Sequence, residues 1–152
     1  MSLQSTVQKQ RFVGLDIHKH YLVAVGVDAD LNQVFGPQTV RLPDLEYWMT
    51  RYLRPDDAVV IEMTTNTWQL YEDLLPHVGS VTVVHPPHVA LITRSQVMND
   101  KIAASTLARL HAKGLLVGIW VPTKEVQELR ALIAQRSKMT RLATQSKNRL
   151  HA

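Results

Sequence analysis

The sequence contains no cysteine, so neither a disulfide bond nor a thiolate metal site can contribute to this protein. No apolar run approaches the roughly 20 residues that a membrane-spanning helix requires. The N-terminal stretch MSLQSTVQKQR also lacks the apolar segment of a signal peptide. We therefore expect a cytoplasmic protein with no membrane partner. With 152 residues, of which 45% are hydrophobic and 20% charged, the chain is long enough to bury one core.

Positive charge is concentrated in the C-terminal tail. From Lys124 onward, seven Lys or Arg residues accompany two Glu residues, so the tail carries +5 and the preceding residues carry −1 of the net charge of +4. A basic segment beside a near-neutral domain suits a polyanionic partner, because neutralising phosphates releases bound counterions. A solvated helix face with surplus Lys and Arg would account for the charge equally well.

Apolar, β-branched runs predict the strands. Residues 11–17, 21–28 and 32–42 are three such runs joined by short polar turns, which indicates an antiparallel meander. The run DAVVIEMT at 57–64 is almost wholly apolar, which is typical of a central strand buried on both faces. SVTVVHP at 80–86 predicts a fifth strand, and LLVGIWVP at 115–122 is a candidate for a further one.

Helices are expected between and after these strands. Spacing of three and four residues between apolar positions predicts helices over 43–53, 66–78 and 100–114, the last closed by Gly114. From Thr123 to the end no proline or glycine interrupts, so one long helix is expected there. The tryptophans are assigned to the core. The order predicts an α/β fold with a mixed sheet, antiparallel at one side and parallel at the other.

Two acidic residues end strands of this sheet. Asp16 follows FVGL and Glu62 follows AVVI. A carboxylate after a buried strand needs a partner, and the carboxyl ends of parallel strands are where such sheets bind ligands. Two carboxylates held together repel, and a divalent cation relieves the repulsion. The alternatives are that Asp16 orders the following turn and that Glu62 pairs with a nearby Lys or Arg.

Asp100 adds a third acid at a helix start, although it could also be only an N-cap. Side chains three residues apart share a helix face, and the position that could carry a second carboxylate is Ala103. Three acids from two strands and a helix form an oxygen-rich site suited to Mg²⁺ or Mn²⁺, and two such ions can act on a phosphodiester. The histidines of HKH and HPPH have no partner set of defined geometry, so no histidine metal site is predicted.

Three motifs in this order and spacing carry a resemblance to a known family: GLDIHK at 14–19, VVIEMT at 59–64 and NDKIAA at 99–104. Together they resemble the RuvC-like domain of the DEDD transposases of the insertion-sequence-110 type, which are related to the Piv DNA invertases. The resemblance extends over nearly the whole chain. It implies a ribonuclease H-like mixed five-stranded sheet flanked by helices, followed by a long C-terminal linker helix.

The resemblance also implies roles for particular residues. Asp16, Glu62 and Asp100 match the first three letters of the DEDD signature as metal ligands, which hold two Mg²⁺ or Mn²⁺ ions in an intact site. The fourth letter falls on Ala103, where the family has Asp. With three acids for two ions, we expect weakened metal binding and little or no DNA cleavage.

The resemblance further implies that this domain is part of a longer protein, a DNA recombinase. Members of the family have a C-terminal domain that supplies a serine nucleophile, and they use a structured bridge RNA; this implies a prokaryotic cytoplasmic protein, associated with the nucleoid when active. The expected organisation is a disordered segment over 1–10, a RuvC-like domain over 11–121, and over 122–152 the start of a helical linker. Apolar residues at three- and four-residue steps along this linker predict that it packs on a second subunit; the alternative is that it frays. The candidate nucleic-acid contacts are basic: Lys19, Lys101, Arg136, Lys138, Arg141, Lys147 and Arg149.

Two other classes of protein share features with this sequence. A sugar-kinase or actin-like ATPase domain also ends its first strand in an aspartate, but it needs small Gly or Thr residues after that aspartate, and DIHKHY has none. A non-catalytic nucleic-acid-binding or assembly module is the alternative that stays open.

Overall fold

The computed structural model describes residues 10–87, 89 and 99–150, so most of the segment expected to be disordered, 1–9, lies outside the described residues. The chain divides into two units, residues 1–119 and 120–152. No helix in the described ranges is both long and apolar enough to cross a membrane.

The first unit is built on a mixed five-stranded sheet, as predicted. Its strands are β1 (Phe12–Ile17), β2 (Tyr21–Val27), β3 (Gln33–Arg41), β4 (Ala58–Glu62) and β5 (Ser80–Val84). They are arranged in the order β3-β2-β1-β4-β5. β1 pairs antiparallel with β2, which pairs antiparallel with β3, whereas β1–β4 and β4–β5 are parallel. The predicted meander and the predicted parallel side are both confirmed.

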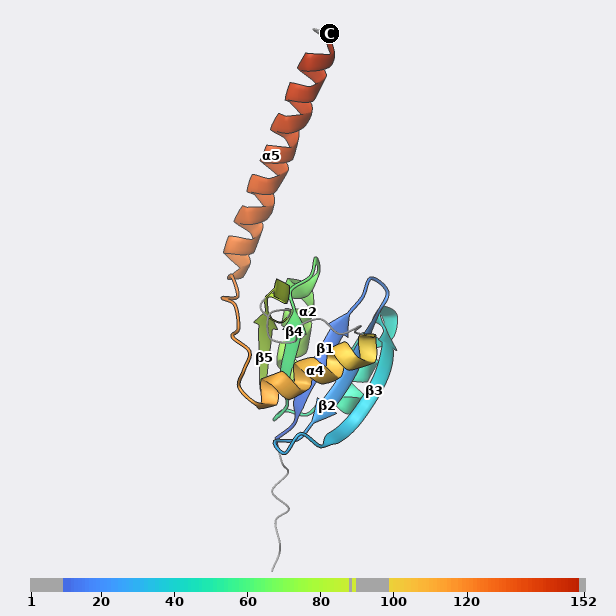
Figure 1. Ribbon diagram of the computed structural model, residues 1–152. Helices are drawn as coiled ribbons and strands as arrows, with labels where there is room; N and C mark the ends of the chain where they lie inside the picture. The colour runs from blue at the N-terminus through green and yellow to red at the C-terminus, as the bar shows by residue number, and fades with distance from the viewer. Residues whose placement is uncertain (1–9, 88, 90–98, 151–152) are drawn as a thin grey trace, which may run out of the picture. The chain divides into compact units, whose positions relative to one another are not determined.

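Helices cover this sheet. They are α1 (Leu45–Tyr52) after a 3₁₀ turn at Leu42–Asp44, α2 (Thr67–Leu74) before a 3₁₀ turn at Leu75–His77, and α4 (Asp100–Ala112). Figure 1 shows α4 crossing β1 and β2. Val23 and Val25 of β2 pack against Ala104 of α4, so the alternate residues of the strands face the opposite side of the sheet.

A buried ion pair joins the amino ends of the two central strands. The Arg11 guanidinium donates to both carboxylate oxygens of Asp57, at 2.8 and 2.6 Å, and to the carbonyl of Tyr52. Asp57 is fully buried and also accepts the backbone N–H of Arg54. Because β1 and β4 start from this point, the pair supports the register that brings their carboxyl ends together.

Two expectations for the region after α4 were wrong. Residues 115–122 form no strand: the N–H of Ile119 donates to the Val83 carbonyl at 2.8 Å, but no ladder continues from it. Leu115 and Val117 are 55% and 75% exposed, so the apolar run does not mark burial on a sheet. Trp48 is buried as expected, whereas Trp120 is 63% exposed and lies under the Arg130 guanidinium, 5.6 Å from its ring centroid.

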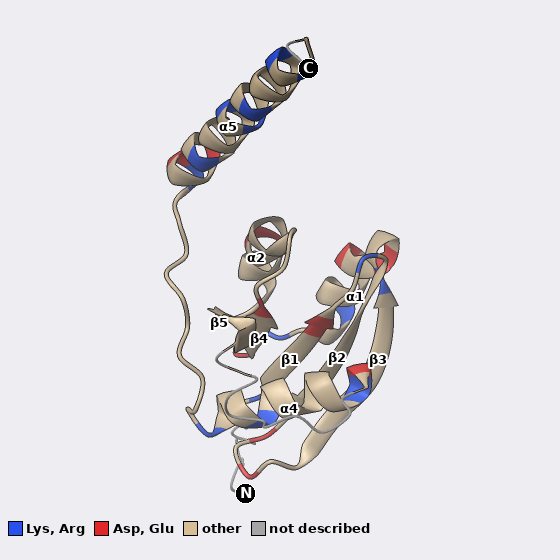
Figure 2. Ribbon diagram, turned by 45° about the horizontal axis from the view of Figure 1, so that its top comes forward, with Lys and Arg blue, Asp and Glu red and all other residues tan. Residues whose placement is uncertain are grey.

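The second unit contains α5 (Lys124–Leu150), which confirms the long C-terminal helix. None of its residues is buried. Basic residues recur along it, as Figure 2 shows in blue.

The end of α4 also matches the sequence prediction, because Gly114 has a φ of 66° and its N–H bonds to the His111 carbonyl, which stops the helix.

Candidate metal centre

The carboxyl ends of β1 and β4 bring two acids side by side. These strands are parallel neighbours, and Leu15 of β1 is paired with Ile61 of β4. The next positions in the same register are Asp16 and Glu62. Neighbouring strands are about 4.8 Å apart, so the two side chains start from adjacent backbone positions. Figure 2 shows the acidic ends of the two strands next to each other.

Asp16 projects to the side of the sheet that α4 covers. Gly14, two residues earlier in β1, approaches α4 so closely that a Cβ there would overlap the carbonyl oxygen of Ala104. Side chains two residues apart in a strand lie on the same face. Asp16 therefore shares the α4 face with Gly14, and the close approach of the two backbones explains why this position holds glycine.

Glu62 lies on the same face by the same reasoning. Val60, two residues earlier in β4, is fully buried in a cluster with Leu107 of α4. Alternation along β4 then places Glu62 on the α4 side, beyond the end of that cluster. Both strand-end acids thus project toward α4.

Asp100 comes to this place from the first turn of α4. The cap of the helix is Asn99, whose side-chain oxygen accepts the N–H of Ile102 at 2.9 Å. The Asp100 carboxylate is therefore not used as a cap. It accepts a hydrogen bond from the hydroxyl of Tyr21 at 2.8 Å, which orients it toward the strand ends.

His18 links the two aspartates, which the sequence did not predict. Its Nε2 is 3.0 Å from Asp16 Oδ2 and 3.4 Å from Asp100 Oδ2, and its ring stacks on Tyr21 with centroids 4.6 Å apart. The ligand atoms of Asp16, His18 and Asp100 all lie within 4.8 Å of one another. Among the described residues, the Glu62 carboxylate does not fall within that spacing. The signal that could have found His18 is its position two residues after Asp16.

The electrostatics of the site favour a cation. Burial raises the pKa of Asp16, an effect opposed by His18 and reinforced by the charge of Asp100. Burial likewise raises the pKa of Glu62, and the charge of Asp16 raises it further. Both groups therefore hold protons more tightly than a solvated carboxyl, because their negative charges are crowded and partly dehydrated. A divalent ion would remove that crowding.

Ala103 occupies the place of a potential fourth acid. It is half-buried, one turn after Asp100 on α4, and precedes Ala104, which packs against the sheet. A carboxylate at this position would point to the same edge as Asp100. The methyl group that is present offers no ligand atom.

The basic residues predicted to contact nucleic acid fall into two groups. Lys19 and Lys101 are exposed, in the β1–β2 turn and the first turn of α4 respectively, on the elements that carry Asp16 and Asp100. The others lie on α5 in the second unit and are exposed there: Arg136, Lys138, Arg141, Lys147 and Arg149.

A mixed five-stranded sheet with acids at the carboxyl ends of its central strands defines a ribonuclease H-like α/β protein. The family model of the DEDD transposases of the insertion-sequence-110 type, described as a transposase, matches residues 13–152. The chain belongs to this family. A comparison with curated proteins gave no significant match. A transposase acts on DNA, and the donor set of carboxylate oxygens with one imidazole would fit a divalent metal ion.

Proposed function

We propose that this chain is the N-terminal, RuvC-like phosphoryl-transfer domain of a DNA transposase, and that its metal site is one acid short. The observation that carries the proposal is the convergence of Asp16, His18 and Asp100 within 4.8 Å, beside Glu62, in a member of a transposase family. Carboxylates held close together repel, and a bound cation would relieve that repulsion.

The proposed ligands are Asp16, Glu62 and Asp100, at the position the DEDD signature assigns to them. When bound there, Mg²⁺ or Mn²⁺ would polarise a phosphodiester and neutralise charge that develops on its oxygens. The chain's own residues would position the ligands. Tyr21 donates to Asp100, and His18 contacts both aspartates, so one oxygen of each aspartate is already oriented.

Ala103 sets the expected activity. An intact site would hold two ions with four carboxylates, whereas this one has three. Ligand number and charge determine affinity for hard cations, so at least one ion binds more weakly. We expect little or no DNA cleavage from this chain.

The proposed partners are DNA and a structured bridge RNA. Lys19 and Lys101 would contact phosphates near the metal ligands, and the basic residues of α5 would contact phosphates without reading sequence. We further propose that α5 is the start of a linker helix through which the protein forms an oligomer, since its apolar residues are exposed: Leu129, Leu132, Ile133, Met139, Leu142 and Leu150. Action in a prokaryotic cytoplasm, at the nucleoid, follows from the same proposal.

A second candidate is a non-catalytic nucleic-acid-binding or assembly module. Two observations favour it: Ala103 stands where the family has an acid, and the exposed α5 is basic. This module would bind nucleic acid through phosphate contacts alone, so Mg²⁺ would not strengthen its binding.

The test is the Mn²⁺ dependence of DNA binding, measured by fluorescence anisotropy on this chain and on Asp16→Asn. The proposed function predicts that Mn²⁺ tightens DNA binding by the unsubstituted chain and not by Asp16→Asn. Asp56→Asn is the matched control, because Asp56 is an exposed acid at the amino end of β4, away from the ligands. Binding that is equally tight with and without Mn²⁺ in all three proteins would favour the second candidate.

A further inference from the structure

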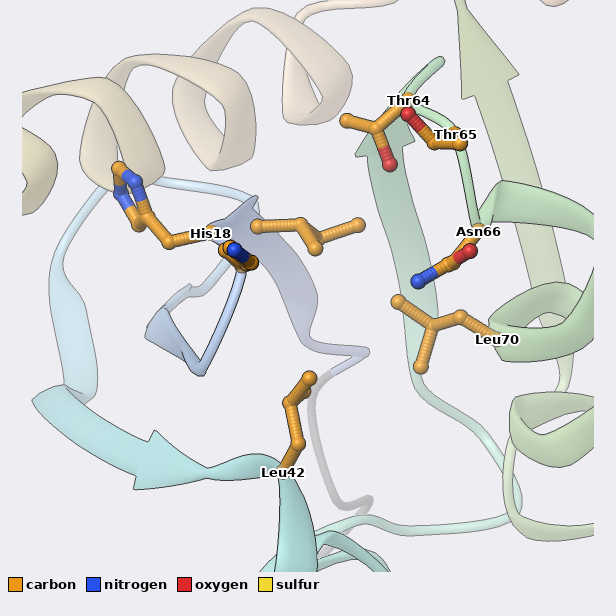
Figure 3. Close-up of a pocket in the computed structure, with 8 residues that line it drawn as sticks. His18, Leu42, Thr64, Thr65, Asn66 and Leu70 are labelled. Carbon is orange, nitrogen blue, oxygen red and sulfur yellow. The ribbon is translucent and has the colours of Figure 1, made fainter.

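A pocket of about 500 Å³ lies at the carboxyl ends of β1 and β4, on the side of the metal centre away from α4. It is hollowed between the β1–β2 turn and the loop that joins β4 to α2, as Figure 3 shows. This is the place where the chain leaves β1 to one side and β4 to the other, which is the usual position of a ligand crevice in such sheets.

The lining of the pocket combines an apolar floor with a polar rim. Ile17, Leu42 and Leu70 supply the floor. Thr65 and Asn66 line one side, and Lys19 lines the other. A flat, partly apolar ligand with polar edges and a nearby negative charge fits this arrangement, and a nucleotide has all three features.

His18 connects the pocket to the metal centre. It lines the pocket, and its Nε2 contacts the carboxylates of Asp16 and Asp100. Ile17 lies between Asp16 and His18 in the chain and faces the other side of β1, into the pocket. A strand whose phosphate lies at the acids therefore has its neighbouring nucleoside at the mouth of the pocket.

Asn66 is the residue whose local structure points most directly to a ligand. It is the N-cap of α2, yet its side chain makes no capping hydrogen bond. The hydroxyl of Thr67 holds the preceding loop, accepting the N–H of Thr64 and donating to the Thr64 carbonyl, and it leaves the Asn66 side chain out of these bonds. The Asn66 amide is directed toward the hollow, as Figure 3 shows. An amide offers a donor and an acceptor together, which matches the hydrogen-bonding edge of a base.

We propose that this pocket holds an unstacked nucleobase of the DNA strand, adjacent to the phosphate at the metal centre. The inference rests on the proposed function, because the DNA strand must first reach the acids. The floor contacts the face of the base, the Asn66 amide bonds its edge, and Lys19 contacts the phosphate on the outer side. Enzymes that act on a nucleic-acid strand often take one base out of the stack, and the pocket contacts repay the cost of unstacking.

The test uses single-stranded DNA carrying 2-aminopurine at one position at a time, titrated with the chain in the presence of Mn²⁺. Unstacking raises 2-aminopurine emission, so we expect one position to brighten on binding. Thr65→Trp fills the pocket from an exposed position. We expect it to abolish the brightening and to weaken binding about tenfold, because the base loses both its contact with the apolar floor and its hydrogen bond to Asn66. Asn66→Ala should weaken binding severalfold, and circular dichroism should show the same fold, since no cap is lost.

Two controls separate the outcomes. Thr50→Trp adds the same ring at an exposed position of α1 outside the pocket, and it should bind as the parent does. An abasic site at the brightening position should make the parent and Thr65→Trp bind alike. If the parent binds DNA with Mn²⁺ dependence but no position brightens and Thr65→Trp binds equally well, the pocket proposal is wrong and the proposed function stands. If the parent binds no DNA at all, both are wrong.

Discussion

Replacing Ala103 with Asp should destabilise the fold in the absence of metal and stabilise it when Mn²⁺ is added. Without metal the substitution lowers helix propensity by about 0.6 kcal/mol and adds repulsion from Asp100 of about 0.3 kcal/mol. Attraction to the α4 N-terminus offsets about 0.4 kcal/mol of this. The net loss is about 0.5 kcal/mol, or ~3 °C in melting temperature for a unit of this size.

With Mn²⁺ the free energy of unfolding of Ala103→Asp should increase by more than that of the unsubstituted chain. At a concentration of about ten times the dissociation constant, an added site stabilises the fold by about 1.4 kcal/mol. The assay is thermal unfolding in EDTA and in Mn²⁺, with calorimetry to count the ions bound. Ile102→Asp is the control, because Ile102 lies in the same turn but is 48% exposed. If both variants respond equally to Mn²⁺, a carboxylate at Ala103 does not join the acids and the reasoning fails.

Three further predictions follow from the described contacts. Burial raises the pKa of Asp16 and of Glu62 above their ordinary values of 3.8 and 4.5. The folded chain therefore binds more protons than the unfolded chain in this pH range. The contribution of these two carboxyl groups to metal-free stability falls as pH rises through the raised pKa values. Urea unfolding in EDTA should show Asp16→Asn gaining on the parent toward pH 7, and a constant difference would contradict this. Gly14→Ala should cost about 3 kcal/mol or prevent folding, because the new Cβ meets α4 backbone that cannot move aside; near-parental melting would show that α4 shifts freely. Asp57→Ala should cost about 3–5 kcal/mol by leaving Arg11 buried without its partner, and an unchanged urea midpoint would show that the ion pair contributes nothing.

The fold was predictable because its strands and helices have strong local patterns. The β-branched runs of the meander and the wholly apolar β4 specify both strand type and burial, and chain order then restricts the topology. The strand predicted over 115–122, after Gly114, was wrong because it too was inferred from a local pattern alone. Its apolar residues resemble a strand, but only Ile119 finds a backbone partner on β5, and local composition does not show whether an edge is available.

The candidate site was predictable in part. Strand ends placed Asp16 and Glu62, and a helix start placed Asp100, so their positions could be expected from secondary structure alone. The contact of His18 with both aspartates depends on the turn between β1 and β2 and on the approach of α4, which are tertiary features. The Asn66 side chain could not be placed from sequence either, because a residue at a helix start is expected to cap the helix, whereas Asn66 makes no capping hydrogen bond.

The most direct test of the central claim is paramagnetic broadening of backbone amide signals by Mn²⁺ in this chain, with Mg²⁺ as the diamagnetic reference. If the acids form one cation site, the amides of Asp16, Glu62 and Asp100 broaden together at low Mn²⁺, and those of Phe12 and Ala58 at the amino ends of β1 and β4 stay sharp. Asp16→Ala should abolish the broadening at all three positions. Broadening of only one position, or of scattered exposed acids, would contradict the account.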